Sequence, residues 1–319
     1  MSRVVTLTLN PALDRSVTLD ALRPGHVHRA RGTRSDAGGK GVNVAACLAD
    51  WGVPVAAAGI LGQDNAAPFQ ALLAAKGIED RFVRIPGETR TNLKLFDAET
   101  GDTTDLNLPG LAVDSATLDL VRALLRRDVT SDALVVLAGS LPGGVVPGIY
   151  AEIAAELRPR GARLVLDASG PALAAALAAP AEALPFAVKP NRHELEDWVG
   201  RPLPTLADVV GAARDLVARG IPLVVVSLGA EGALFAAADG MVHAHPPPTR
   251  VTSTVGAGDA LVAGLVAGLH AGLDRVATAR LAMAFAAGKL GLAGANLPAR
   301  ETVLAIARTV RVESLDVPV

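Results

Sequence analysis

Short apolar runs alternate with longer helical segments through the middle of the chain, and this alternation constrains the fold more than any other feature. The runs expected to form strands cover residues 133–138, 163–167, 186–189 and 222–228. The segments expected to form helices cover residues 114–127, 147–158, 171–179, 192–199 and 205–219. Strands that alternate with helices form right-handed β-α-β units and a parallel sheet. The sequence therefore predicts an α/β protein.

The two ends of the chain add further elements to this pattern. A strand is expected at residues 4–9, where Asn10-Pro11 ends it because proline cannot continue a ladder. Two polar, turn-rich stretches, about residues 16–35 and 91–108, are expected to pair as a small separate sheet. The remaining expected elements are helices at 42–51 and 65–76, a strand at 55–60, a hairpin at 232–245, and helices at 258–271, 274–292 and 299–308.

Composition narrows the class of protein. Half of the residues are hydrophobic but only 3% are aromatic, so aliphatic side chains must fill a core of the kind found in parallel sheets covered by helices. A net charge of −2 without a basic block argues against nucleic acid as a partner. The single cysteine, Cys47, is expected to be a core side chain. No apolar stretch is long enough for a membrane span and the start lacks a signal sequence, which predicts a cytoplasmic protein without membrane contact.

The sharpest motif is Gly256-Ala257-Gly258-Asp259, which leads from a β-branched run that includes Ser253 and Thr254 into a long apolar helix. Unpaired amides at such a helix start bind anions, because they lie at the positive end of the helix dipole. Asp259 could be an ordinary acidic residue of a first helical turn. Alternatively, the amides neutralise a phosphoryl group while Asp259 accepts the proton of an attacking hydroxyl.

A second motif, Lys189-Pro190-Asn191 followed by Glu194, comes at the end of a buried strand, where open α/β sheets bind ligands. Asn191 and Glu194 have the spacing of a capping box. Lys189 favours a binding role instead, because its charge must reach solvent or an anion. The nearby carboxylate of Glu194 has the chemistry to hold Mg²⁺ through water.

Two glycine-containing segments complete the set of motifs. Residues 227–232 end another strand and suit the close approach of a nucleotide, although by themselves they are explained better by a plain β-turn. Gly38-Gly39-Lys40-Gly41-Val42-Asn43 enters a helix but has neither the spacing of a Walker loop nor that of a dinucleotide fingerprint. By itself it is either a binding loop or an ordinary glycine loop.

Taken in order, the three motifs around Lys40, Lys189 and Asp259 resemble those of the ribokinase-like, or pfkB, carbohydrate kinases. The resemblance runs essentially from end to end and implies one kinase domain over residues 1–319. In that family a doubly wound, mostly parallel sheet carries a small β-sheet lid, here formed by about residues 16–35 and 91–108. The lid often supplies a dimer interface, which implies a homodimer.

The resemblance also implies roles for individual residues, with ATP and Mg²⁺ as cofactors. Asp259 is the implied general base, with Gly256, Ala257 and Gly258 as the anion hole, and Glu194 with Asn191 is the implied Mg²⁺-linked pair. The implied ATP contacts are Lys189, Asn191, Ser227, Leu228, Gly229, Ala230, Glu231, Gly232 and Gly258. The implied contacts to sugar hydroxyls and to a phosphate already on the sugar are Asp14, Gly38, Gly39, Lys40, Asn43, Arg90, Asn92, Lys94, Ser140 and Asp259.

Within the family, the combination of residues 10–14 with Arg90 resembles the phosphosugar kinases, and the run from Thr89 to Lys94 is most similar to kinases of fructose 1-phosphate. That similarity implies phosphorylation at the C6 hydroxyl to give fructose 1,6-bisphosphate. Kinases of tagatose 6-phosphate or fructose 6-phosphate are alternatives, as is a phosphosugar sensor without catalysis. An unrelated dinucleotide enzyme is disfavoured, because Asn10-Pro11 stands where its glycine fingerprint would be.

Overall fold

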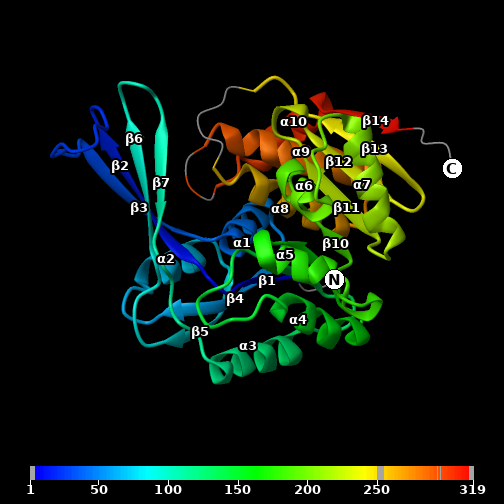
Figure 1. The fold of residues 1–319 in the computed structure, drawn as a ribbon, viewed down its shortest axis with the longest axis horizontal. Helices are drawn as coiled ribbons and strands as arrows, with labels where there is room; N and C mark the ends of the chain where they lie inside the picture. The colour runs from blue at the N-terminus through cyan, green and yellow to red at the C-terminus, as the bar shows by residue number, and fades with distance from the viewer. Residues whose placement is uncertain (1–3, 250–254, 293, 295, 316–319) are drawn as a thin grey trace.

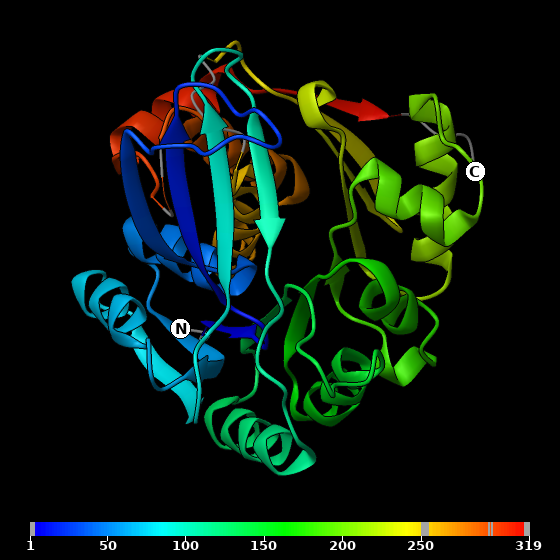
Figure 2. The same cartoon turned by 60° about the vertical axis from the view of Figure 1, so that its left-hand side comes forward.

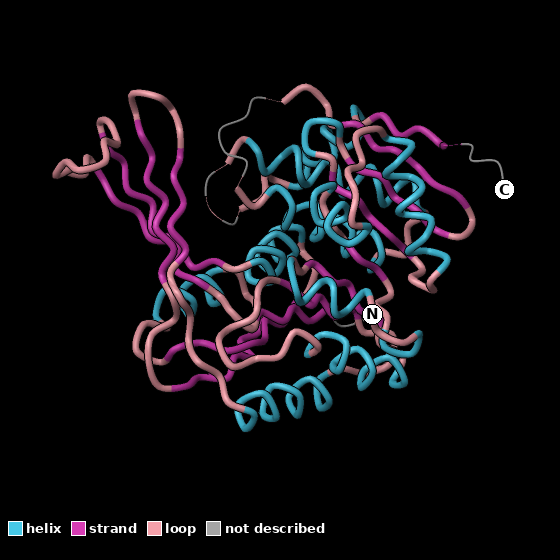
Figure 3. Tube along the Cα trace, in the orientation of Figure 1, coloured by secondary structure: helices cyan, strands magenta, loops and turns pink. Residues whose placement is uncertain are grey.

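The structure, a computed structural model, describes residues 4–249, 255–292, 294 and 296–315. Within these residues the strands form two sheets, one of ten strands and one of four. The large sheet is covered by helices on both faces, and the small sheet stands out from one side of the protein (Figure 1, Figure 3). The predicted α/β class, the doubly wound arrangement and the separate small sheet are confirmed.

The large sheet has the strand order β14-β13-β12-β11-β10-β9-β8-β1-β4-β5. Its parallel strands are β1 (Val4–Thr8), β4 (Val55–Gly62), β5 (Glu79–Ile85), β8 (Leu134–Ala138), β9 (Arg163–Asp167), β10 (Ala187–Val188) and β11 (Leu223–Ser227). Antiparallel strands β12 (Ala233–Ala237), β13 (Gly240–His245) and β14 (Arg311–Leu315) complete one edge. The chain moves outward from β1 to β4 and β5, then returns to β8 on the other side of β1. Ligands of open α/β sheets bind beyond the strand ends at such a reversal.

The helices divide between the two faces according to the strand side chains that they cover. Along β1, Val4 packs into one hydrophobic cluster and Val5 into the other, as expected from the alternation of side chains along a strand. One face carries α1 (Lys40–Trp51), α2 (Ala67–Ala75), α8 (Ala257–His270), α9 (Arg275–Leu290) and α10 (Arg300–Thr309). The other carries α3 (Ser115–Asp128), α4 (Ile149–Leu157), α5 (Gly170–Leu177), α6 (Arg192–Val199) and α7 (Leu206–Ala218).

Helices α8 and α9 approach each other unusually closely. A methyl group added at Gly264 of α8 would lie 2.6 Å from Cα of Ala282 in α9, so only glycine fits at this crossing. Trp51 of α1 packs edge-on against Phe285 of α9, with ring centroids 5.1 Å apart. These contacts fix the start of α8 and the last turns of α9 relative to each other, and both segments reach the candidate site.

The small sheet pairs the two polar stretches of the sequence, as expected. Its order is β3-β2-β6-β7, with β2 at Ala12–Leu19, β3 at Gly32–Gly38, β6 at Thr91–Asp97 and β7 at Thr103–Asn107. Strand β2 begins shortly after β1 ends, and β3 leads into α1, so the small sheet is connected to the centre of the large one (Figure 2). The small sheet therefore includes residues on both sides of the predicted range 16–35, from Ala12 at the start of β2 to Gly38 at the end of β3.

The two faces of the small sheet differ in chemistry. Directly paired strand residues share a face, so the register places Asp14, Asn92 and Lys94 together on one polar face. The opposite face carries the apolar side chains Val17, Leu93, Leu95 and Leu106. Leu106 is 46% exposed, so this apolar face is open in the single chain.

Several elements differ from the sequence-based expectation. Strands β5 and β14 were not expected, and the strand expected at residues 186–189 contains only Ala187–Val188. Strand β5 lies at a sheet edge and begins with three charged residues, and β14 follows α10 directly, so neither presents a long apolar run. No helix within the described residues is long and apolar enough to cross a membrane.

Candidate active site

The carboxylate of Asp259 lies in the first turn of α8, behind the glycines that begin the helix. Gly256 precedes the helix with φ +79°, a left-handed conformation that glycine adopts without strain. Asp259 is only 8% exposed, and its Oδ2 accepts a hydrogen bond of 2.7 Å from Nδ2 of Asn43 in α1. The carboxylate thus faces a neighbouring helix and does not cap its own. Residues 252–254 of the motif lie outside the described residues.

The surroundings of Asp259 raise the pKa of its carboxyl. Burial is the largest cause, since it disfavours the charged form, and the negative charge of Asp167 adds to it. The positive charge of Lys40 acts in the opposite direction. A carboxylate with a raised pKa is a stronger base than an ordinary aspartate, which suits proton abstraction from a hydroxyl.

Two lysines from different parts of the chain meet at one buried carboxylate. Oδ1 of Asp167, at the end of β9, lies 3.0 Å from Nζ of Lys40 and 3.1 Å from Nζ of Lys189. Register explains the second contact, because β10 pairs with β9 and brings Lys189 beside Asp167. Asp167 is completely buried, and its Oδ2 has no hydrogen-bond partner among the described residues. The three side chains form a buried cluster with one excess positive charge.

The charges in this cluster shift the pKa values of Lys40 and Asp167. Burial alone would lower the pKa of Lys40, but the negative charges of Asp167 and Asp259 outweigh it and hold the pKa above its ordinary value. Burial would raise the pKa of Asp167, yet Lys189 and Lys40 lower it. Lys40 and Asp167 are therefore charged at neutral pH. A methyl group at Gly258 would lie 3.9 Å from Nζ of Lys189, so this ammonium lies close to the start of α8.

Asn191 and Glu194 form the capping box that their spacing indicates. Oδ1 of Asn191 accepts from the amide of Glu194, and Oε2 of Glu194 accepts from the amide of Asn191, both at 2.8 Å. This structural role engages one oxygen of each side chain. The charge of Glu194 also raises the pKa of Lys40, so Glu194 lies near the cluster formed by Lys40, Lys189 and Asp167. A role in holding Mg²⁺ remains a prediction.

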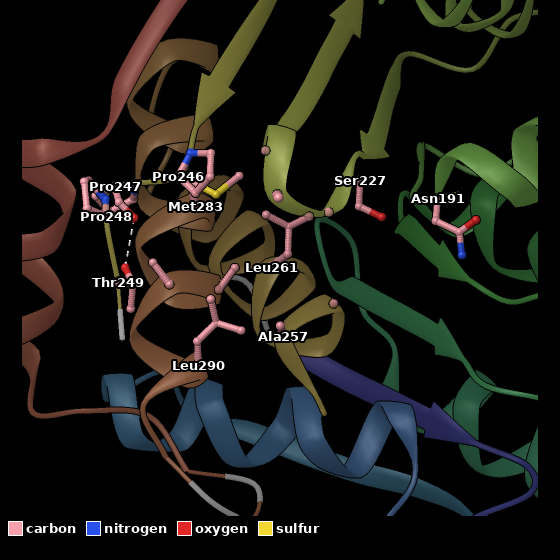
Figure 4. A pocket seen from close by; sticks show the side chains of 16 residues that line it. Asn191, Ser227, Pro246, Pro247, Pro248, Thr249, Ala257, Leu261, Met283 and Leu290 are labelled. Carbon is pink, nitrogen blue, oxygen red and sulfur yellow. Dashed lines mark hydrogen bonds between the residues drawn. The ribbon is translucent and has the colours of Figure 1, made fainter. Parts of the chain in front are cut away.

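A pocket of about 700 Å³ lies beside the start of α8 (Figure 4). On one side it brings together predicted nucleotide contacts: Asn191, Ser227, Gly229, Ala230, Gly232 and Gly258. On the other side Leu261, Met283 and Leu290 form an apolar wall, with the run Pro246-Pro247-Pro248 at the rim. Within the predicted nucleotide segment, residues 227–232, Leu228 and Glu231 do not line the pocket. Glu231 instead pairs with Arg192 at 2.8 Å.

The predicted sugar-side residues gather where the small sheet meets α1. Nδ2 of Asn92 donates to Oδ1 of Asp14 at 3.1 Å. A methyl group at Gly38 would lie 2.8 Å from Oδ2 of Asp14, and Gly39 has φ +116°, so the glycines allow this loop to pass close to Asp14 and to precede Lys40. Asn43 links this loop to Asp259, because its amide donates to the carbonyl of Gly39 at 2.9 Å and its side chain donates to Asp259.

The residues predicted to hold a sugar phosphate are held in place by the segment after β1. The guanidinium of Arg90 donates to the carbonyls of Asn10 and Pro11 at 3.2 and 3.3 Å, and burial lowers its pKa. The hydroxyl of Ser140 accepts from Nδ2 of Asn10 at 3.1 Å. Lys94 pairs with Asp105 at 3.1 Å on the polar face of the small sheet. Arg90 and Ser140 thus share Asn10 as a neighbour, whereas Lys94 lies further out on the sheet.

Sequence reasoning missed Asp167, the apolar pocket wall and the buried Lys289 of α9. Asp167 ends an apolar strand just as Lys189 does, and this shared position is the signal that could have found it. The pocket wall is contributed by helices whose apolar residues look like ordinary core in the sequence. Lys289 is a single charged residue between Ala286-Ala287-Gly288 and Leu290-Gly291-Leu292, and a lysine within such a run is the signal that could have found it.

The arrangement has the parts needed to move a phosphoryl group. Amides at a glycine-rich helix start and two lysines can neutralise phosphate oxygens, while a neighbouring base accepts a proton from an alcohol. An apolar pocket with glycine-lined walls can hold a nucleotide base and its phosphates. The fold and this site together define a small-molecule kinase.

Comparison with known proteins agrees with that class. The model of the pfkB family carbohydrate kinases matches residues 7–302. Two curated relatives are the 1-phosphofructokinases of Xanthomonas campestris pv. campestris, 52% identical over 89% of each chain, and of Rhodobacter capsulatus, 49% identical over 98% of each chain. The chain belongs to the pfkB family of carbohydrate kinases.

Solved structures resemble this chain over nearly its whole length. Phosphofructokinase-2 of Escherichia coli, in complex with substrates and products, has a TM-score of 0.89 at 31% identity and covers 96% of this chain and 98% of its own. A possible 1-phosphofructokinase of Thermotoga maritima has a TM-score of 0.86 at 28% identity and covers 98% of this chain and 100% of its own. The family assignment therefore holds for both sequence and fold.

Proposed function

We propose that this chain transfers the γ-phosphoryl group of ATP to the C6 hydroxyl of D-fructose 1-phosphate, giving fructose 1,6-bisphosphate and ADP. The observation that carries the proposal is the buried carboxylate of Asp259, held by Asn43 in the first turn of α8, next to Ala257 and Gly258 of the pocket lining. The relatives named 1-phosphofructokinase, up to 52% identical, support the choice of sugar phosphate. The expected cytoplasmic location fits an enzyme that uses ATP and a sugar phosphate.

In the proposed reaction Asp259 orients the C6 hydroxyl and accepts its proton. The hydroxyl oxygen forms a bond to the γ-phosphorus while the bond from that phosphorus to the bridging oxygen of ADP breaks. Burial and the charge of Asp167 raise the pKa of Asp259, which makes it a better proton acceptor once ionised. Amides of Gly256, Ala257 and Gly258 stabilise the negative charge on the transferred group.

Lys40 and Lys189 neutralise charge on the phosphates from the side of the large sheet. Asp167 holds both ammoniums at hydrogen-bonding distance and balances one of the two charges. Lys189 lies near Gly258 and is assigned to the nucleotide phosphates, whereas Lys40, 34% exposed, is assigned to the sugar hydroxyls, as the resemblance implies, and to the group that is transferred to them. The asymmetry in burial supports this division of roles.

ATP would occupy the pocket of Figure 4. Its base would lie against Leu261, Met283 and Leu290, and its phosphates would pass Gly229 and Gly232 toward Gly258. Both Gly229 and Gly232 have positive φ, so their backbone can approach a ligand closely. Asn191 and Ser227 supply polar groups at the pocket edge.

Mg²⁺ fits the donors present without a dedicated protein cage. No group of three His, Cys, Asp or Glu side chains suited to a metal occurs among the described residues, and Mg²⁺ on a nucleotide is typically held by one or two carboxylates, water and phosphate oxygens. Glu194, with Asn191, would hold it through water, and the orphaned Oδ2 of Asp167 is a further acceptor for such water. Bound there, Mg²⁺ supplies charge neutralisation on the phosphates.

The sugar phosphate would bind against the polar face of the small sheet. Asp14, Gly38, Gly39, Asn43 and Asn92 are assigned to the sugar hydroxyls. Arg90, Lys94 and Ser140 are assigned to the phosphate on C1, with Arg90 as the bidentate donor. In this arrangement the small sheet acts as the lid of a single kinase domain, and its position beside α1 supports that role.

A homodimer through the small sheet is the proposed assembly. The support is the apolar face made by Val17, Leu93, Leu95 and Leu106, which no other part of the described chain covers at Leu106. An open apolar face on a small sheet is typical of a protein interface. A solved relative, phosphofructokinase-2 of Escherichia coli, has a tetrameric inhibited form.

The substrate is tested by initial rates of ADP release with Mg·ATP and a parallel panel of fructose 1-phosphate, tagatose 6-phosphate, fructose 6-phosphate and ribose. We expect the highest kcat/KM with fructose 1-phosphate. A preference for either 6-phosphate would keep the mechanism and replace the substrate. Binding of fructose 1-phosphate without ADP release from any member of the panel would identify a sensor and refute the proposed catalysis.

A further inference from the structure

A lysine that the proposed mechanism does not use is buried beside the anion hole. Lys289, in the last turn of α9, is only 3% exposed, although lysine side chains ordinarily extend their charge to water. Its Nζ donates to the carbonyl of Leu292 at 2.9 Å. Among residues 4–249, 255–292, 294 and 296–315, no carboxylate forms an ion pair with it. Burial lowers the pKa of Lys289, because an ammonium buried with one neutral acceptor is costly, and an anion bound nearby would offset that cost and favour the charged form.

The side chain of Lys289 lies against the first residue of the anion hole. A methyl group at Gly256 would be 3.3 Å from Cε and 4.0 Å from Nζ of Lys289. The close approach of α8 and α9 at Gly264 and Ala282 holds the two elements in this relation. The ammonium therefore lies beside Gly256, the first of the residues whose amides are assigned to the transferred phosphoryl group.

The charged and titratable groups facing Lys289 come from three neighbouring elements: Cys47 of α1, Asp259 of α8 and Arg34 of β3. Burial raises the pKa of the Cys47 thiol to about 12, so it is neutral at physiological pH. Asp259 is the one carboxyl in this set, and Arg34, which already pairs with Asp36 at 2.8 Å, adds a second positive charge. The positive charge of Arg34 lowers the pKa of Lys289, whereas the charge of Asp259 raises it.

We propose that Lys289 is a positioning residue for phosphoryl transfer, whose buried ammonium adds fixed positive charge behind Gly256 to the anion hole facing the γ-phosphoryl group. This inference rests on the proposed function, because it takes the amides of Gly256, Ala257 and Gly258 as the anion hole. It gives a reason for burying a lysine where an apolar side chain would pack equally well. Through the same charge, Lys289 stabilises the carboxylate form of Asp259.

Nucleotide binding tests the proposal without turnover. Calorimetry would compare ADP with the triphosphate analogue whose β–γ bridge is an imido group, in wild type, Lys289→Met and Lys289→Arg. We expect Lys289→Met to weaken the analogue roughly tenfold more than ADP, less than the loss of a direct oxyanion donor, and Lys289→Arg to retain most of the difference. Lys76→Met, which removes a largely buried lysine paired with Asp50, is the matched control and should change neither affinity.

The pH dependence of kcat/KM separates charge from packing. Lys289→Met should move the acid limb to higher pH, since Asp259 loses a cation that favours its ionised form, and Lys289→Arg should restore the limb. Equal weakening of ADP and the analogue, or equal defects in both variants, would overturn the proposal in favour of a purely structural lysine. If Lys289→Met does not fold, Lys289→Gln gives the same readings. A wild type inactive on every sugar phosphate would refute the proposed function, while the binding comparison would still decide the role of Lys289.

Discussion

Replacement of Asp167 by asparagine tests the buried charge cluster most sharply. Asparagine keeps the size of the side chain but removes the negative charge that Lys40 and Lys189 share. Lys189 is 4% exposed, so its ammonium has no route to water when the charge is lost. The variant therefore leaves two facing cations in the interior, with no other change in shape.

The expected cost follows from the burial of the three groups. Removing one partner of a buried pair costs about 3–5 kcal/mol. Because Lys40 is one-third exposed and its share is screened by solvent, we expect a loss of about 3 kcal/mol in the free energy of unfolding at neutral pH. The pKa of Asp167 in the folded protein lies below its ordinary value, which is its pKa in the unfolded chain. The ionised carboxylate therefore adds its full share to the free energy of unfolding above the ordinary pKa, and this share is lost as the pH falls through the folded-state pKa. The difference from wild type should shrink in acid.

Chemical denaturation at neutral pH measures this loss of stability. The control is Asp105→Asn, which removes the exposed partner of Lys94 and is expected to cost well under 1 kcal/mol.

The Asp167→Asn variant should also change the pH dependence of activity. Since the charge of Asp167 raises the pKa of Asp259, residual kcat/KM should show an acid limb displaced to lower pH. Wild-type stability together with an unmoved acid limb would refute the account of the cluster.

Two further substitutions test neighbouring claims. Lys40→Met should lower kcat and move the acid limb of kcat/KM to higher pH, because Lys40 opposes the raised pKa of Asp259; a limb that stays in place would show that the two groups are not coupled. Leu106→Glu should convert the proposed dimer to monomer in sedimentation experiments, whereas Thr103→Glu, on the opposite face of the small sheet, should not; a monomeric wild type would exclude this assembly.

Much of the fold was predictable because its signals are local. Apolar runs separated by helical segments predicted the parallel strands, and the polar stretches around β2 and β6 predicted the small sheet. Strand β5 was not predicted because four of the seven residues of Glu79–Ile85 are charged and the strand lies at a sheet edge. Strand β14 was not predicted because the segment Arg311–Leu315 is extended through its pairing with β13 and has no long apolar run. Edge strands depend on tertiary pairing more than on their own composition.

The site residues likewise include some that local sequence predicts and some that only the fold brings together. The Gly256–Asp259 motif was recognisable because the helix start and its carboxylate are adjacent in sequence. Asp167 and Lys40 are 127 residues apart, and only the order of β9, β8 and β1 in the sheet brings them together. Lys289 reaches Gly256 through the packing of α9 on α8, a contact that the apolar character of both helices does not encode. Charged residues that only the order of the strands brings together have no fixed spacing in the sequence, so the sequence alone does not predict such a cluster.

The most direct test of the central claim is steady-state turnover by Asp259→Asn, with Mg·ATP binding measured in parallel by calorimetry. If Asp259 is the general base, kcat should fall by about 10²–10⁴-fold while Mg·ATP affinity changes little, because the amides, Lys40 and Lys189 remain. Turnover within a few-fold of wild type in the asparagine variant would contradict the account.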